Sequence, residues 1–150
     1  MSSRVLVLIA LVTEALMSCA GSVTAIQGNL QVVARPAEVS AGQTVHFTIT
    51  VTGPATYSRG VCLHTVQLWA AGPTDRIPIN PQTGIQCLSL LRREVPTGTS
   101  DSFDVYWRTT GVPPGRYVVH GFLRGYEAGA PDISSNQDNL PAVRVDVNSA

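Results

Sequence analysis

A strict alternation of apolar and polar residues constrains this chain more than any other feature of its sequence. In the segment Thr44–Thr52 the apolar residues recur at every second position, and they are Val45, Phe47, Ile49 and Val51. Successive side chains of a β-strand point to opposite faces, so a period of two is typical of a strand with one buried face. We therefore expect a half-buried antiparallel strand here.

Further short segments show the same extended pattern, and residues that favour turns separate them. The expected strands are Leu30–Ala34, Thr44–Thr52, Cys62–Ala70, Arg76–Ile79, Ile85–Leu91, Ser102–Thr109, Arg116–Arg124 and Ala142–Val147. No segment after Ser22 has a convincing helical period. The sequence therefore predicts an all-β domain over residues 29–148, built as an antiparallel β-sandwich of about seven to eight strands.

The apolar positions of these strands predict the residues of the core. They are Phe47, Ile49, Val66, Leu68, Phe103, Val105, Trp107, Tyr117, Val119, Val143 and Val145. One position conflicts with the pattern, because His64 would share a face with Val66 and Leu68. Either a bulge shifts the register at this point, or His64 lies at the rim of the sandwich.

The amino terminus has the features of a secretory signal peptide. Arg4 precedes the apolar run Val5–Val12, and small residues follow around positions 18–22. Such a run is too short to span a bilayer, which needs about 20 apolar residues. We therefore expect residues 1–18 to direct export of the protein to an extracytoplasmic location.

The segment Leu16-Met17-Ser18-Cys19 resembles the lipobox of bacterial lipoproteins. The resemblance implies lipidation of Cys19, which becomes the first mature residue, so that acyl chains anchor the protein to a membrane. Residues 19–28 would then form a short linker. The alternative is ordinary cleavage after Ala20 or Ala25, which releases the protein without Cys19.

Two cysteines remain once Cys19 is set aside. In an exported chain Cys62 and Cys87 are expected to form a disulfide, which would close a loop of about 26 residues and stabilise the fold by about 3.5 kcal/mol. The alternative is a metal site of Cys62, His64 and Cys87. No CxxC or HxxxH spacing supports that alternative, so we expect neither a metal nor another cofactor.

Two connections are candidate binding surfaces. The first is the long segment Gly125–Pro141, which carries Tyr126, Asp132 and Asp138, because long loops in compact domains are often functional. Asp132, Asn136 and Asp138 also offer oxygen ligands for Ca²⁺, but their spacing is not that of an EF-hand, and a solvated loop is the expected state. The second is the segment Gly72–Gly84, which carries Asp75 and Arg76.

The charge balance and the histidine positions exclude two classes of function. Ten Lys and Arg residues balance ten Asp and Glu residues, so the chain lacks the basic surface that nucleic-acid binding needs. His46, His64 and His120 each fall within an expected strand, and none neighbours a GxSxG nucleophile motif. Asp101 and Asp104 fall on opposite faces of one strand. We therefore expect no catalytic residues and no enzyme.

Two longer segments, Val39–Val51 and Trp107–Leu123, resemble the BsuPI-type intracellular proteinase inhibitor domain. In the second segment the turn Pro113-Pro114-Gly115 leads to Tyr117 at the start of a strand. The resemblance implies an immunoglobulin-like β-sandwich, with proteinase inhibition as one possible activity. The favoured hypothesis is a non-catalytic cell-envelope binding or scaffold module that binds an unidentified protein partner, with an exported proteinase inhibitor and a metal-handling protein as alternatives.

Overall fold

The computed structural model describes residues 21–60, 62–82, 90–128 and 138–150. In these residues the chain is all-β, with eleven strands and no helix, as the alternating pattern predicts. Consequently, the described residues contain no helix of the length and apolarity that a membrane crossing requires.

The first sheet contains four antiparallel strands in the order β1-β2-β4-β9. Their bounds are β1 Val23–Gln27, β2 Leu30–Arg35, β4 Thr44–Thr52 and β9 Ser100–Arg108. Strand β4 has the alternation that the sequence predicts, with every second residue buried. Among the described residues β9 has a strand on one side only, so it forms an edge of this sheet.

The second sheet contains five strands in the order β3-β11-β10-β6-β7. Their bounds are β3 Glu38–Ser40, β6 Val66–Ala71, β7 Arg76–Pro78, β10 Gly115–Leu123 and β11 Val143–Asn148. All neighbours are antiparallel except β3, which pairs in parallel with β11. The parallel pair departs from the expected purely antiparallel arrangement, and it arises because the chain leaves the first sheet after β2 and joins the second before it returns at β4.

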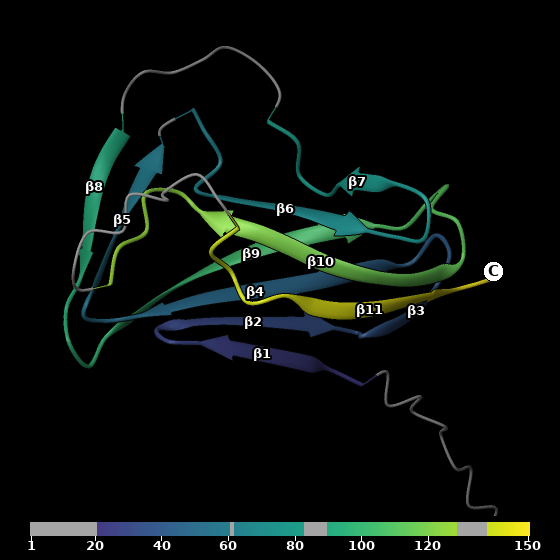
Figure 1. The fold of residues 1–150 in the computed structure, drawn as a ribbon, viewed down its shortest axis with the longest axis horizontal. Helices are drawn as coiled ribbons and strands as arrows, with labels where there is room; N and C mark the ends of the chain where they lie inside the picture. Colours follow the sequence, from purple (N-terminus) through teal and green to yellow (C-terminus); the bar gives the residue numbers. More distant parts are fainter. Residues whose placement is uncertain (1–20, 61, 83–89, 129–137) are drawn as a thin grey trace, which may run out of the picture.

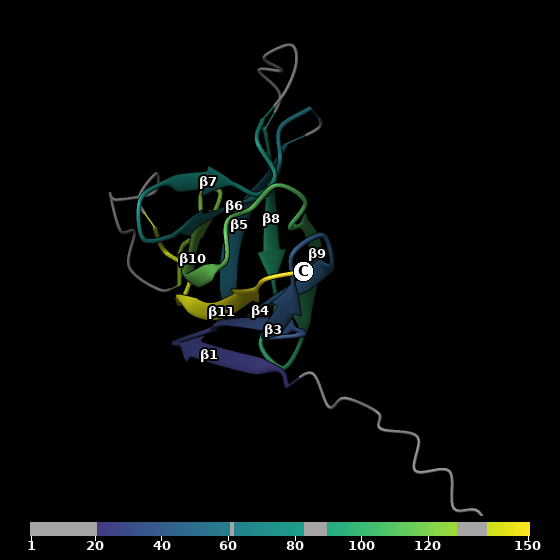
Figure 2. The same ribbon diagram turned by 90° about the vertical axis from the view of Figure 1, so that its right-hand side faces the viewer.

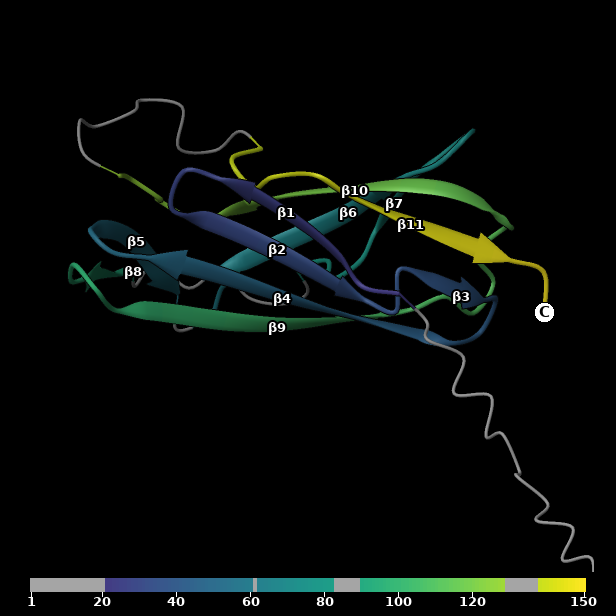
Figure 3. The ribbon, with the colours of Figure 1, turned by 90° about the horizontal axis from the view of Figure 1, so that it is seen from below.

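The two sheets face each other, and their inner side chains form one core (Figures 1 and 3). Figure 2 shows both layers from the end that carries the C-terminus. The layers approach each other along one edge, where β1 and β2 contact β11. Along the opposite edge, β9 of one sheet faces the start of β6 in the other.

A separate two-stranded ribbon, β5 (Ala55–Gly60) paired with β8 (Leu90–Val95), projects at the end of the molecule away from the C-terminus (Figure 1). Strand β5 follows β4 after Gly53 and Pro54, and β8 leads into β9. Gly53 lies at the bend, where a Cβ atom would overlap the carbonyl oxygens of Val95 and Pro96. Only glycine fits this close approach of two backbones.

The predicted core is confirmed at ten of its eleven positions, which are buried, while Phe103 is only partly buried. Tyr117 is almost fully buried, its ring packs edge-on against Trp107 at 5.5 Å between centroids, and its hydroxyl donates a hydrogen bond to the Pro113 carbonyl at 2.6 Å. The turn before β10 and the core are therefore joined by one side chain.

Several strand boundaries differ from the prediction. Strand β6 begins at Val66 rather than Cys62, so His64 lies outside any strand and is exposed. The expected linker over residues 19–28 contains β1, which pairs with β2. Strand β8 lies further along the chain than the expected strand Ile85–Leu91, whose first five residues are outside the described part.

Strands β3 and β5 were not expected from the sequence. Strand β3 is only three residues long, and β5 has the sequence Ala-Thr-Tyr-Ser-Arg-Gly, in which only Ala55 and Tyr57 are buried. Such segments carry too few apolar residues to produce a clear period of two.

Candidate binding groove

A groove of about 590 Å³ runs along the free edge of β9. Five consecutive residues of this strand, Asp101–Val105, line it. Side chains on one face of a strand come only from alternate residues, so a groove that touches five in a row must lie against the edge of the strand. We call this the β9 groove.

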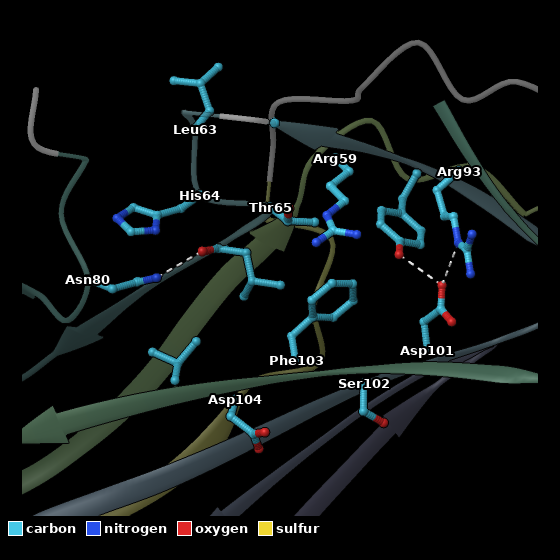
Figure 4. A pocket seen from close by; sticks show the side chains of 14 residues that line it. Arg59, Leu63, His64, Thr65, Asn80, Arg93, Asp101, Ser102, Phe103 and Asp104 are labelled. Atoms are coloured by element: carbon cyan, nitrogen blue, oxygen red, sulfur yellow. Dashed lines mark hydrogen bonds and ion pairs between the residues drawn. The ribbon is translucent and has the colours of Figure 1, made fainter. Parts of the chain in front are cut away.

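The opposite wall of the β9 groove comes from the ribbon and from the segment that leads into β6 (Figure 4). The ribbon contributes Tyr57, Arg59, Gly60 and Arg93, and the other segments contribute Leu63, His64, Thr65, Val66 and Asn80. The groove therefore lies where the ribbon meets the open edge between the two sheets.

A hydrogen-bonded group of three residues forms one end of the groove. The hydroxyl of Tyr57 donates to Oδ2 of Asp101 at 2.8 Å, and Nε of Arg93 lies 3.3 Å from the same oxygen (Figure 4). The Tyr57 ring packs edge-on against Phe103 at 5.3 Å between centroids. Burial and the bond to Asp101 raise the pKa of Tyr57 to about 12, because both disfavour the phenolate.

Arg59 is the second cation of the groove, and its side chain points toward the ring of Phe103 (Figure 4). Whereas Arg93 pairs with Asp101, Arg59 has no hydrogen bond or ion pair with any described residue. Its guanidinium therefore faces the groove with donors that no described residue uses.

The second acidic residue of this stretch, Asp104, faces away from the groove (Figure 4). Its Oδ1 lies 2.7 Å from Nε2 of His46 and accepts a hydrogen bond from the Thr48 hydroxyl at 3.3 Å, both on the outer face of β4. His46 also stacks on Tyr106, with ring centroids 4.6 Å apart. Asp101 and Asp104 thus lie on opposite faces of β9, as expected.

Two side-chain amides fix the wall that precedes β6. Asn80 accepts a hydrogen bond from the Leu68 N–H and donates one to the Val66 carbonyl, each at 2.8 Å. Gln82 accepts a hydrogen bond from the His64 N–H at 2.8 Å and donates one to the Cys62 carbonyl at 2.9 Å. Asn80 thus bonds to the backbone of β6 itself, whereas Gln82 bonds to the backbone just before β6, where His64 lies exposed outside the strand.

The structure does not bring the predicted binding residues together. Asp75 and Arg76 lie at the β6–β7 turn, where the Arg76 guanidinium stacks on Trp69 at 4.1 Å. Tyr126 follows the opposite end of β10 and packs against the core. Asp138 lies 4.0 Å from Nδ1 of His120, which is paired with Trp69 across β10 and β6.

Three further predicted residues, Cys19, Cys87 and Asp132, lie outside the described residues. The predicted lipidation and the predicted Cys62–Cys87 disulfide therefore stay predictions. Within the described ranges no group of three or more His, Cys, Asp or Glu residues is gathered in a way that would hold a metal ion.

The sequence did not single out the residues of the β9 groove as a site. Tyr57, Arg59 and Arg93 belong to strands that were not predicted over those residues, and Asp101 was considered only as a catalytic acid. The one available signal was the charged residues of β9, since an edge strand commonly carries charges.

No protein-family model matches the chain, and no curated protein matches it significantly. Among solved structures it is similar to a β-glucosidase from Listeria innocua (11% identity, TM-score 0.44), covering 86% of this chain but only 16% of that one. It is similar also to the alkylpurine DNA glycosylase AlkC of Pseudomonas fluorescens, with 13% identity and a TM-score of 0.43, covering 83% of this chain and 32% of that one. A third similar structure is a Niemann-Pick type C2 protein from Japanese carpenter ant, with 10% identity and a TM-score of 0.35, covering 74% of this chain and 79% of that one. At these values the likenesses say nothing about what this chain does.

Proposed function

We propose that this chain is a non-catalytic binding module with immunoglobulin-like topology, and that its β9 groove takes an extended segment of a protein partner. The observation that carries the proposal is the groove itself, which combines a strand edge that no described strand pairs with and a wall of side chains. Exposed strand edges bind extended peptides by adding a strand to the sheet.

The order of the strands supports the immunoglobulin-like assignment. One sheet places β2, β4 and β9 side by side, and the other places β3, β11, β10, β6 and β7 side by side. This order matches strands A, B and E facing A′, G, F, C and C′ of that fold. The bond from the Tyr117 hydroxyl to the Pro113 carbonyl matches the tyrosine corner at the start of strand F.

The same comparison explains where the groove comes from. An immunoglobulin constant-type domain has a fourth strand, D, beside strand E. Here β9 has no described strand in that place, and the ribbon projects at the end of the sheets instead. An extended peptide in the groove would occupy the position of the missing strand and satisfy the backbone groups at the edge of β9.

A selection from a display library of linear twelve-residue peptides against the purified full chain tests this function. The enriched peptides should bind the parent protein and lose binding to the variant Thr65→Tyr, because a large side chain at Thr65 projects into the groove. The control Thr110→Tyr places the same side chain at an exposed position outside the groove and should leave binding unchanged. Peptides that bind Thr65→Tyr as well as the parent protein would overturn the proposal.

The proteinase-inhibitor alternative rests on a different feature, the projecting ribbon. Leu90 and Leu91 of β8 are 50% and 59% exposed there and offer apolar contacts for another protein. Titration of a secreted subtilisin-like protease with the full chain tests this alternative. Stoichiometric loss of protease activity that Leu91→Ser abolishes would support it, and unchanged activity would reject it.

We further propose that the protein is exported and held in the cell envelope by a lipid on Cys19. The mass of the mature N-terminus from cells that express the full chain tests both parts. A diacylated or triacylated Cys19 is expected. A free N-terminus after Ala20 or Ala25 would replace the anchored form by a secreted one, and an intact Met1 would reject export.

A further inference from the structure

We propose that the β9 groove selects peptides that carry a carboxylate, and that Arg59 is the residue that binds it. The inference rests on the proposed function, since it names the chemistry of the segment that the groove takes. It comes from the charges of the groove, from the surroundings of Arg59 and from the spacing of side chains along a strand.

Among the described residues, the charges that face the groove leave one cation without a counter-ion. The carboxylate of Asp101 is already matched by Arg93 and by the hydroxyl of Tyr57. Asp104 is turned to the other face of β9, where His46 contacts it. Arg59 is therefore the charge that no described residue matches, and an incoming carboxylate complements it.

The surroundings of Arg59 favour a carboxylate over a neutral polar group. Its guanidinium lies near the phenol of Tyr57. Burial raises the pKa of this phenol, and the positive charge of Arg59 lowers it by a smaller amount. The Tyr57 and Phe103 rings pack against each other and form a rigid apolar surface next to it. A guanidinium offers paired donors that match the two oxygens of a carboxylate.

The spacing along a strand sets the sequence pattern of the ligand. Alternate side chains of a peptide added to β9 point into the groove. One of these positions meets Arg59, and the inward positions two residues away meet the partly buried side chains of Leu63 and Phe103. The expected ligand therefore has an acidic residue with apolar residues at its second neighbours, or it ends at the acidic position in a free C-terminal carboxylate.

Four synthetic nine-residue peptides of alternating Thr and Val distinguish these possibilities by calorimetric titration of the full chain. Three have blocked termini and carry Glu, Gln or Lys at the central inward position. The fourth carries central Gln and a free C-terminal carboxylate. We expect the Glu peptide to bind about five- to tenfold more tightly than the Gln peptide, as befits a charge-assisted bond at a partly exposed site.

Variants of the protein assign the effect to one residue. Arg59→Gln should remove the preference for Glu over Gln, and Arg59→Lys should restore part of it. The matched control is Arg92→Gln, an exposed arginine of the same ribbon that pairs with Glu127 and does not line the groove. It should leave the preference unchanged.

The outcomes separate this inference from the proposed function. If the Glu, Gln and Lys peptides bind equally and Thr65→Tyr abolishes binding of all of them, the groove takes peptides and the role of Arg59 is overturned. If only the peptide with the free C-terminus binds tightly, and the other three do not, the carboxylate that Arg59 binds is a chain terminus and Arg59 keeps its role. If none binds, the proposed function and this inference are both overturned.

Discussion

Replacement of Tyr57 by Phe removes one hydroxyl from the end of the β9 groove and leaves the ring in place. The residue is 4% exposed, and its hydroxyl donates to Asp101 at 2.8 Å. A hydrogen bond to a charged group contributes about 1.5–3 kcal/mol to stability. The Asp101 side chain is 27% exposed and keeps Arg93 as a partner, so water offsets part of the loss. We expect Tyr57→Phe to lower the free energy of unfolding by about 1–2 kcal/mol at neutral pH.

The pH dependence of this difference is a sharper test than its size. The folded protein raises the pKa of Tyr57 from 10.0 to about 12. A raised pKa stabilises the folded state fully below the unfolded pKa, and that stability is lost as the pH rises through the folded value. The difference between the parent protein and Tyr57→Phe should therefore be constant from neutral pH up to pH 10 and close between pH 10 and 12.

Urea unfolding of both proteins across this range measures the difference, and absorbance titration of tyrosinate identifies the group. Tyr106→Phe is the matched control, because Tyr106 is 61% exposed. It should change neither the stability nor its pH profile. A Tyr57→Phe protein as stable as the parent, or a difference that persists at pH 12, would refute the hydrogen bond to Asp101 as a source of stability.

Three further substitutions test the packing and the polar contacts of the fold, each measured by urea unfolding. Tyr117→Phe removes the bond to the Pro113 carbonyl, and we expect a loss of about 1–2 kcal/mol; an unchanged midpoint would show that this bond contributes nothing. Gly121→Ala places a Cβ atom against the backbone and a leucine of β6, so a loss above about 2 kcal/mol is expected, while Gly21→Ala, which meets nothing within 4 Å, should be neutral. Asn80→Asp keeps the oxygen that accepts from the Leu68 N–H but replaces the donating amide nitrogen by an oxygen that repels the Val66 carbonyl. We expect the free energy of unfolding to fall by about 1–3 kcal/mol, and part of this loss to be regained at acidic pH.

The sequence predicted the central strands because burial is regular there. In β4 and β10 every second residue is buried, and a period of two follows directly. Strand β6 shows the limit of that pattern. Its apparent N-terminal extension from Cys62 is held by the side-chain amide of Gln82, which bonds to the backbone of Cys62 and His64, and hydrophobic periodicity does not register such a contact.

The groove was harder to predict than the strands. Its lining residues come from β5, β8, β9, the start of β6 with the segment before it, and Asn80 after β7. These parts are far apart in the sequence and are joined only when the ribbon meets the edge of the sheets. Arg59 and Asp101 look like ordinary solvated charges in the sequence. Asp101 has Arg93 as a counter-ion, whereas Arg59 has none among the described residues. Only the folded structure reveals this difference.

Amide hydrogen exchange of the full chain, with and without the central-Glu peptide, tests the use of the β9 edge most directly. Bound peptide should slow exchange in Asp101–Val105 and leave the opposite edge strand, β1, unchanged, because an added strand would bond only to the edge that it joins. Slower exchange in β1 or at the β6–β7 turn, with none in β9, would contradict the account.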